Sequence, residues 1–220
     1  RRVCAAPAAD PPVLEAKPGS AQLLTPQEPA TAIWGYQGNA PGPLIRARQG
    51  GEVAVRLVNR LDVPTTIHWH GIRIDNAMDG VAHLTQEPVA PGESFDYRFT
   101  VPDAGTFWYH PHQRSFEQVG RGLYGALIVE EADPPRVDRD ITWVLDDWRL
   151  TQSAEISEDF GNRHDMSHGG RVGNTATRNG RAPDEFAVRR GERVRLRLVN
   201  AANARIFGLD FQDHAPTVIA

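Results

Sequence analysis

Two short histidine pairs most constrain what this chain can fold into. His68-Trp69-His70 and His110-Pro111-His112 each lie in a stretch that predicts a β-strand. Successive side chains of a strand point to opposite faces, so residues i and i+2 lie on one face about 7 Å apart. Each pair therefore presents two imidazoles side by side, and four imidazoles converge if the two strands are neighbours. Because imidazole suits Cu, Zn, Fe and Ni, a metal site is the first hypothesis.

The sequence around these pairs predicts an all-β fold. Residues 33–129 form short β-rich runs separated by Gly, Pro, Asn and Asp, with no convincing helical periodicity. We therefore expect a sandwich or barrel as the first domain, over residues 31–130. The predicted strands are Val53–Val58, Thr65–His70, Ser94–Val101, Thr106–His110 and Leu123–Val129.

The rest of the chain predicts a lead-in, a linker and a second domain. Residues 1–30 contain six prolines and predict an extended N-terminal lead-in. The polar segment 131–139 predicts a linker, and residues 140–220 predict a second domain that opens with a strand at 141–145. Residues 151–182 are rich in Gly, Asn, Asp, Ser and Arg, which predicts a long loop with one helical turn.

An internal repeat connects the two domains. Residues 50–59 match residues 191–200 at a constant offset of 141 residues. A period as long as a domain indicates duplicated domains. Carried onward, the offset aligns His68 with Leu209 and His70 with Phe211, so the second copy is predicted to keep a strand-like alternation without the imidazoles. The second copy is also shorter than the first, and we expect the polypeptide to be truncated.

Charge and cysteine content exclude several classes of partner. The formal net charge of −4, from 24 Lys+Arg against 28 Asp+Glu, argues against nucleic acid or an anionic membrane surface as the main partner. The sequence contains no apolar run of about 18 residues, the length a membrane span needs. Cys4 is the only cysteine, so an intrachain disulfide is excluded. Arg1-Arg2 indicates either the remnant of a twin-arginine export signal or a clone boundary; export predicts a periplasmic or secreted protein.

Three interpretations of the histidine pairs are open from the residues alone. The first is a set of core or surface histidines without a metal. The second is a mononuclear Zn or Fe site that uses one pair and a further histidine. The third is copper shared with histidines from elsewhere in the protein.

The residues that flank the histidines favour copper. Residues 65–71 and 105–112 closely resemble the first two copper signatures of the multicopper oxidases, a family that includes laccases and bacterial cuprous and copper-resistance oxidases. Asp79-Gly80, residues 91–94 and residues 122–129 extend the resemblance, which is close over 31–148 and looser over 180–220. The resemblance implies a cupredoxin-like Greek-key β-barrel domain followed by a second, incomplete cupredoxin-like domain without copper ligands.

The resemblance also implies a role for each candidate site residue. By motif position, His68 ligates a type 2 copper, His70 and His110 ligate one type 3 copper, and His112 ligates the other. These four residues are then half of the ligands of a trinuclear copper cluster between the first and last domains. Asp79 matches an acidic position that bacterial members use to relay protons, although Asp79-Gly80 is also explained as a plain turn.

The implied activity is the one-electron oxidation of phenols, diamines or Cu(I), coupled to the four-electron reduction of dioxygen to water. The family's His-Cys-His motif is missing, so the type 1 copper is expected in a further C-terminal cupredoxin domain and this chain alone is expected to be inactive. The alternative is a non-enzymatic copper-binding or copper-sequestering cupredoxin protein. A copper-free structural relative is less favoured, because it should have lost these histidines. A separate segment, His164-Asp165-Met166-Ser167-His168, combines ligand types that bind Cu(I), but a solvated loop is the simpler interpretation.

Overall fold

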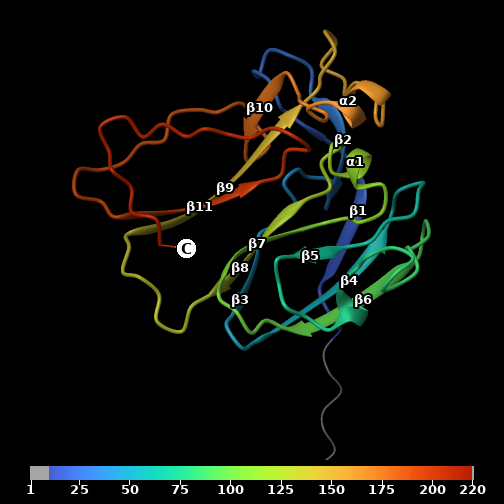
Figure 1. Ribbon diagram of the computed structural model, residues 1–220, viewed down its shortest axis with the longest axis horizontal. Helices are drawn as coiled ribbons and strands as arrows, with labels where there is room; N and C mark the ends of the chain where they lie inside the picture. The colour runs from blue at the N-terminus through green and yellow to red at the C-terminus, as the bar shows by residue number, and fades with distance from the viewer. Residues whose placement is uncertain (1–9, 220) are drawn as a thin grey trace, which may run out of the picture.

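The computed structural model describes residues 10–219, which form three β-sheets with short connecting helices (Figure 1). The predicted all-β class is confirmed. Two four-stranded sheets, with the orders β2-β1-β4-β6 and β3-β8-β7-β5, build the first part of the chain, and the three-stranded sheet β10-β9-β11 builds the second. The elements are β1 (Val13–Ala21), β2 (Thr31–Tyr36), β3 (Ile45–Arg48), β4 (Glu52–Asn59), β5 (His68–His70), η1 (Asn76–Met78), β6 (Ser94–Thr100), β7 (Gly105–His110), α1 (Ser115–Gln118), β8 (Gly125–Glu130), β9 (Arg139–Trp148), α2 (Arg163–Ser167), β10 (Thr175–Arg178) and β11 (Val194–Asn200).

The core of the first part lies between its two sheets. In β4 the residues alternate strictly, and Val53, Val55 and Leu57 point into this core while their neighbours face outward. Trp69 from the opposite sheet packs against Phe99 with ring centroids 4.9 Å apart. The alternation that predicts these strands from the sequence is therefore the same alternation that fills the core.

The repeat seen in the sequence is also present in the sheets. β1 runs parallel to β4 and antiparallel to β2, and β9 runs parallel to β11 and antiparallel to β10. Ala16 is the register partner of Asn59, and Leu145 is the register partner of Asn200, which is Asn59 plus 141 residues. We call each of these three-strand units a frame. Both frames end their antiparallel strand in a turn with two residues at positive φ, Gln37-Gly38 and Asn179-Gly180.

The predicted lead-in differs from the structure over its described part. β1 lies between β2 and β4, so residues 13–21 belong to the first sheet. Pro18 is tolerated there because β4 pairs only with residues 13–16, and beyond that point β1 has one neighbour and an open edge. The predictions for Arg1-Arg2 and Cys4 lie outside the described residues.

Other predicted elements differ in extent. β5 is shorter than the predicted strand Thr65–His70, and Thr65 makes only an isolated bridge to Val89. The predicted loop 151–182 contains α2, as expected, and also the strand β10. Residues 201–219 contain no strand, so the strand-like alternation expected near Leu209 and Phe211 is not formed in the described structure.

The two parts of the chain share a second hydrophobic cluster. The strand β8 is buried on both faces, as a continuous apolar run predicts, with Leu127 in the first core and Ala126 in the second. Val144 and Trp148 of β9 and Val199 of β11 complete the second cluster from the other side. Among the described residues, no helix is long and apolar enough to cross a membrane.

Candidate metal centre

The pairing of β5 with β7 brings the four predicted histidines together. The strands are antiparallel, with His68 opposite His110 and Trp69 opposite Tyr109. Trp69 and Tyr109 are fully buried on the core face, so the histidines project from the other face. The ring centroid of His68 lies 5.5 Å from those of His70 and His110 and 4.3 Å from that of His112.

The nitrogen atoms of these rings are spaced for metal binding. His70 Nδ1 and His110 Nε2 are 3.2 Å apart. Two bonds of about 2.0 Å at a near-tetrahedral angle place two ligand nitrogens about 3.3 Å apart, so this pair fits one ion. His68, His110 and His112 also each offer a ligand atom within 4.8 Å of the others.

Backbone carbonyls fix the orientation of two of the rings. His68 Nδ1 is 2.8 Å from the carbonyl oxygen of Asp79, and His110 Nδ1 is 3.1 Å from that of Pro111. A carbonyl oxygen only accepts, so both Nδ1 atoms carry the proton and both Nε2 atoms present a lone pair. Metal-binding histidines commonly have the second nitrogen held in this way.

Burial favours the neutral form of three of the four imidazoles, those of His70, His110 and His112. Burial lowers the pKa of His110 to about 3, helped by the neighbouring His68. Burial, with His68 beside them, also lowers the pKa values of His70 and His112. Desolvation disfavours the imidazolium form, so burial favours the neutral rings of His70, His110 and His112, which offer lone pairs to a metal.

Asp79 and Gly80 form a turn against the first histidine. Besides its carbonyl contact, Asp79 places carboxylate Oδ1 3.4 Å from His68 Nδ1. Gly80 follows with φ +72°, and a Cβ at this position would lie 1.7 Å from the carbonyl oxygen of Ile67. The turn can lie this close to β5 only because residue 80 has no side chain.

Several supporting residues were not predicted from the sequence. The Thr66 hydroxyl accepts a 3.1 Å hydrogen bond from the backbone N–H of His112, and the Ser115 hydroxyl donates to the Pro111 carbonyl at 2.9 Å. Gln118 of α1 is buried, accepts from the Thr65 hydroxyl at 2.7 Å, and donates to the backbone. The sequence feature that could have indicated these contacts is the pair of adjacent threonines, Thr65 and Thr66, before the first histidine pair. Buried hydroxyl groups need hydrogen-bond partners, so such a pair predicts polar neighbours.

A cavity of about 620 Å³ lies beside the histidines and is lined by Trp108, His110 and Phe116 together with Met166 of α2. Trp108 stacks on His110, with centroids 4.0 Å apart and planes 23° apart. Of the segment 164–168, Asp165 and Met166 thus border the same space as His110. The group of ligand atoms that could hold one ion, from His68, His110 and His112, includes no residue of the segment 164–168.

Comparisons with known proteins show which family this chain resembles. Two family models, both described as multicopper oxidase, match residues 19–134 and 139–220. Multicopper oxidase MmcO of Mycobacterium tuberculosis (strain ATCC 25618 / H37Rv) is 34% identical over 230 residues, covering 89% of this chain and 45% of the relative. Copper resistance protein A of Pseudomonas syringae pv. tomato is 32% identical over 228 residues, covering 83% and 37%.

Solved structures of known proteins also resemble most of this chain. Lac15 from a marine microbial metagenome has a TM-score of 0.75 at 49% identity, covering 87% of this chain and 48% of that one. The multi-copper oxidase from Pseudomonas Thermotolerans has a TM-score of 0.78 at 40% identity, covering 89% and 48%. These likenesses support the predicted cupredoxin-like fold. The chain spans less than half the length of each of these four proteins.

Proposed function

Because this chain belongs to the multicopper oxidase family, we propose that it supplies half of the ligands of a trinuclear copper cluster. Within a longer protein, the cluster couples one-electron oxidation of a small reductant to the four-electron reduction of dioxygen to water. A further cupredoxin domain supplies the remaining ligands and the type 1 copper.

One observation carries this proposal: four imidazoles converge at the end of β5 and β7, with His70 Nδ1 and His110 Nε2 3.2 Å apart. The donor set fits copper, because imidazole is among its preferred ligands and burial lowers the pKa values of His70 and His110, which favours their neutral, metal-binding form. A set made only of neutral nitrogens is less suited to Mg²⁺ or Ca²⁺, which prefer oxygen.

Each histidine has a distinct place in the proposal. His70 and His110 share one type 3 copper, His112 binds the other, and His68 binds the type 2 copper. Bound copper supplies the one-electron redox chemistry. The chain holds its rings at fixed angles through the Asp79 and Pro111 carbonyls, and Trp108 shields one face of His110 from water.

Asp79 is the proposed proton carrier. Its carboxylate is partly exposed, and Oδ1 lies 3.4 Å from His68 Nδ1. A carboxylate at the rim of the site can take a proton from solvent at its oxygen and hold it beside the histidines. Dioxygen reduction consumes four protons, so the site needs such a group.

The reductant in this proposal is a phenol, a diamine or Cu(I). The relatives named copper resistance protein A favour Cu(I) among these. We place the protein in the periplasm or outside the cell, a location that the family resemblance and the Arg1-Arg2 pair both favour. The alternative function, copper sequestration without catalysis, requires the same histidines. An oxygen-consumption assay distinguishes it from the oxidase function.

Copper titration of the metal-free chain, followed by pulsed electron paramagnetic resonance of the bound ion, tests the ligand assignment. His70→Ala and His112→Ala should each lose copper and imidazole coupling, whereas His83→Ala, whose side chain is 66% exposed, should not. Unchanged copper binding in both site variants would refute the assignment.

Oxygen consumption separates the two functions. Alone, the copper-loaded chain should consume no dioxygen with a phenol or Cu(I). Joined to a C-terminal domain of a relative, it should do so, and Asp79→Asn should then slow turnover while leaving the copper content unchanged. A joined protein that holds its full copper complement but stays inactive would support sequestration instead.

A further inference from the structure

We propose that His164 and His168 form a second, independent metal site, a two-imidazole clip for Cu²⁺ at the C-terminal end of helix α2. His164 lies in α2 (Arg163–Ser167), and His168 is the residue that follows the helix at its C-terminal end. The two rings stack with centroids 4.4 Å apart and planes 21° apart. Both residues are exposed, so an ion reaches them directly from solvent.

The hydrogen bonds of His168 leave its outer nitrogen ready to bind. Its Nδ1 lies 3.2 Å from the His164 carbonyl oxygen and 2.9 Å from Ser167 Oγ. The carbonyl can only accept, and the Ser167 hydroxyl donates to the Arg163 carbonyl at 2.7 Å. Nδ1 of His168 therefore carries the proton, and Nε2 presents its lone pair. This is the arrangement that orients a metal-binding histidine.

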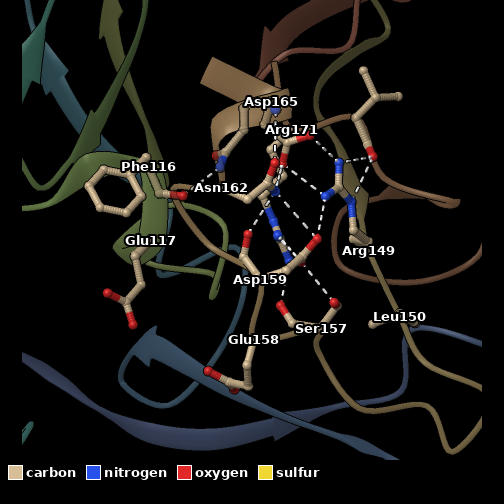
Figure 2. Close-up of polar contacts among 12 residues, drawn as sticks. Phe116, Glu117, Arg149, Leu150, Ser157, Glu158, Asp159, Asn162, Asp165 and Arg171 are labelled. Carbon is tan, nitrogen blue, oxygen red and sulfur yellow. Dashed lines mark hydrogen bonds and ion pairs between the residues drawn. The ribbon is translucent and has the colours of Figure 1, made fainter. Parts of the chain in front are cut away.

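Polar contacts hold the short helix in place before any ion binds (Figure 2). A five-residue helix is unstable alone, because nucleation fixes several residues for one hydrogen bond. Here the Asn162 side chain caps it by accepting from the Asp165 N–H at 2.9 Å. The Asp165 carboxylate receives two hydrogen bonds from Arg149, at 2.8 and 3.0 Å.

A second set of contacts holds the segment on either side of the helix. Arg171 donates to the Ser157 carbonyl at 2.6 Å and to the Asp159 carboxylate, and its guanidinium lies 3.9 Å from the centroid of Phe160. Arg149 bridges to the same Asp159 carboxylate at 2.7 Å. The clip is thus pre-organised, which reduces the entropy lost on binding an ion.

The donor set selects the metal. Met166 lies two residues from His164, on another side of the helix, and borders the cavity beside His110, so its sulfur does not join the clip. The Asp165 carboxylate is engaged by Arg149. Two imidazoles and solvent water remain, and for such ligands Cu²⁺ binds more tightly than Ni²⁺ or Zn²⁺. The site is therefore one for Cu²⁺, and not the mixed sulfur and imidazole Cu(I) site that was the less favoured interpretation of this segment from the sequence.

Copper titration into the ¹⁵N-labelled full chain tests the clip residue by residue. Bound Cu²⁺ should broaden the amide signals of residues 163–168 in a step separate from the broadening around β5 and β7. His164→Gln and His168→Gln should each weaken binding at α2 by about 100-fold, because each converts a chelate into a single ligand. The double variant should be little weaker than either single one.

Two controls make the outcome decisive. His214→Gln, at another exposed histidine, should leave the α2 broadening unchanged, and His164→Gln should leave the broadening at β5 and β7 unchanged. The proposal is overturned if α2 broadens only at the copper concentration that broadens His83 and His214. It is equally overturned if the losses from the two single variants add, since independent ligands and not a clip would then be binding.

Discussion

Replacing Gly80 with alanine tests how the turn at Asp79 positions the first histidine. The backbone at residue 80 has φ +72°, which costs an L-residue about 1–2 kcal/mol. The added Cβ would also lie 1.7 Å from the Ile67 carbonyl oxygen, an overlap that no side-chain rotation relieves. Overpacking of this kind adds about 1–3 kcal/mol. We therefore expect Gly80→Ala to lower the free energy of unfolding by about 2–5 kcal/mol.

The same change should weaken copper binding at His68. To relieve the overlap, the turn must move away from β5, and the Asp79 carbonyl then leaves His68 Nδ1, now 2.8 Å away. Loss of such an orienting hydrogen bond costs about 10–100-fold in metal affinity. Urea unfolding of the metal-free chain and copper titration of the folded chain measure the two effects separately.

Gly92 supplies the matched control. It has φ +82°, and a Cβ built there has no atom within 4 Å. Gly92→Ala therefore carries the backbone cost without the overlap, and copper affinity should not change. If Gly80→Ala matches Gly92→Ala in both stability and copper affinity, the close approach of the turn does not matter and the reasoning is wrong. If only stability falls, the turn does not orient His68.

Two further predictions concern acidity and the contact between the two parts of the chain. The folded pKa of His110, about 3, lies below its ordinary value of 6.5, so the unfolded chain binds more protons in that window. In the metal-free chain the stability that His110 contributes should thus be fully present above about pH 6.5 and fall by about 2 kcal/mol from pH 7 to pH 5. The free energy of unfolding of His110→Phe, measured with urea, should vary with pH by that much less, and an equal variation would contradict the assignment. Arg197, 2% exposed, makes two hydrogen bonds to Asp140 and one to Thr106 of β7. Arg197→Ala should cost about 2–4 kcal/mol in thermal or urea unfolding because Asp140 then loses both of these hydrogen bonds and keeps only Arg195, 3.9 Å away. Arg197→Met with Asp140→Leu should recover part of the loss.

Much of the site geometry follows from one rule of strand structure. Because side chains alternate, burying Trp69 and Tyr109 sends His68 and His110 to the opposite face, and the sequence is sufficient to predict this. What the sequence does not contain is the partner of each strand. The 3.2 Å approach of His70 to His110 depends on β5 pairing with β7 in one register, a contact between residues 40 positions apart.

The elements that sequence analysis missed are stabilised by distant contacts. β10 has the unremarkable sequence Thr-Ala-Thr-Arg, and it is held by pairing with β9 and by the indole of Trp148, which donates to the Thr177 hydroxyl at 3.0 Å. β1 is obscured by Pro18, which is tolerated only because of where β4 ends. Neither arrangement leaves a local pattern, because the residues responsible are far away in the chain.

The two frames with matching register suggest how chemistry of this kind can diversify. Both copies keep the same strand pairing and the same left-handed turns, while the four histidines lie on strands and loops outside the frame. After a duplication, one copy of the domain can gain or lose metal-binding side chains around its frame, while the other copy keeps the frame without them. A ligand set could therefore be grafted onto strands beside the second frame without redesigning the strand pairing of the frame itself.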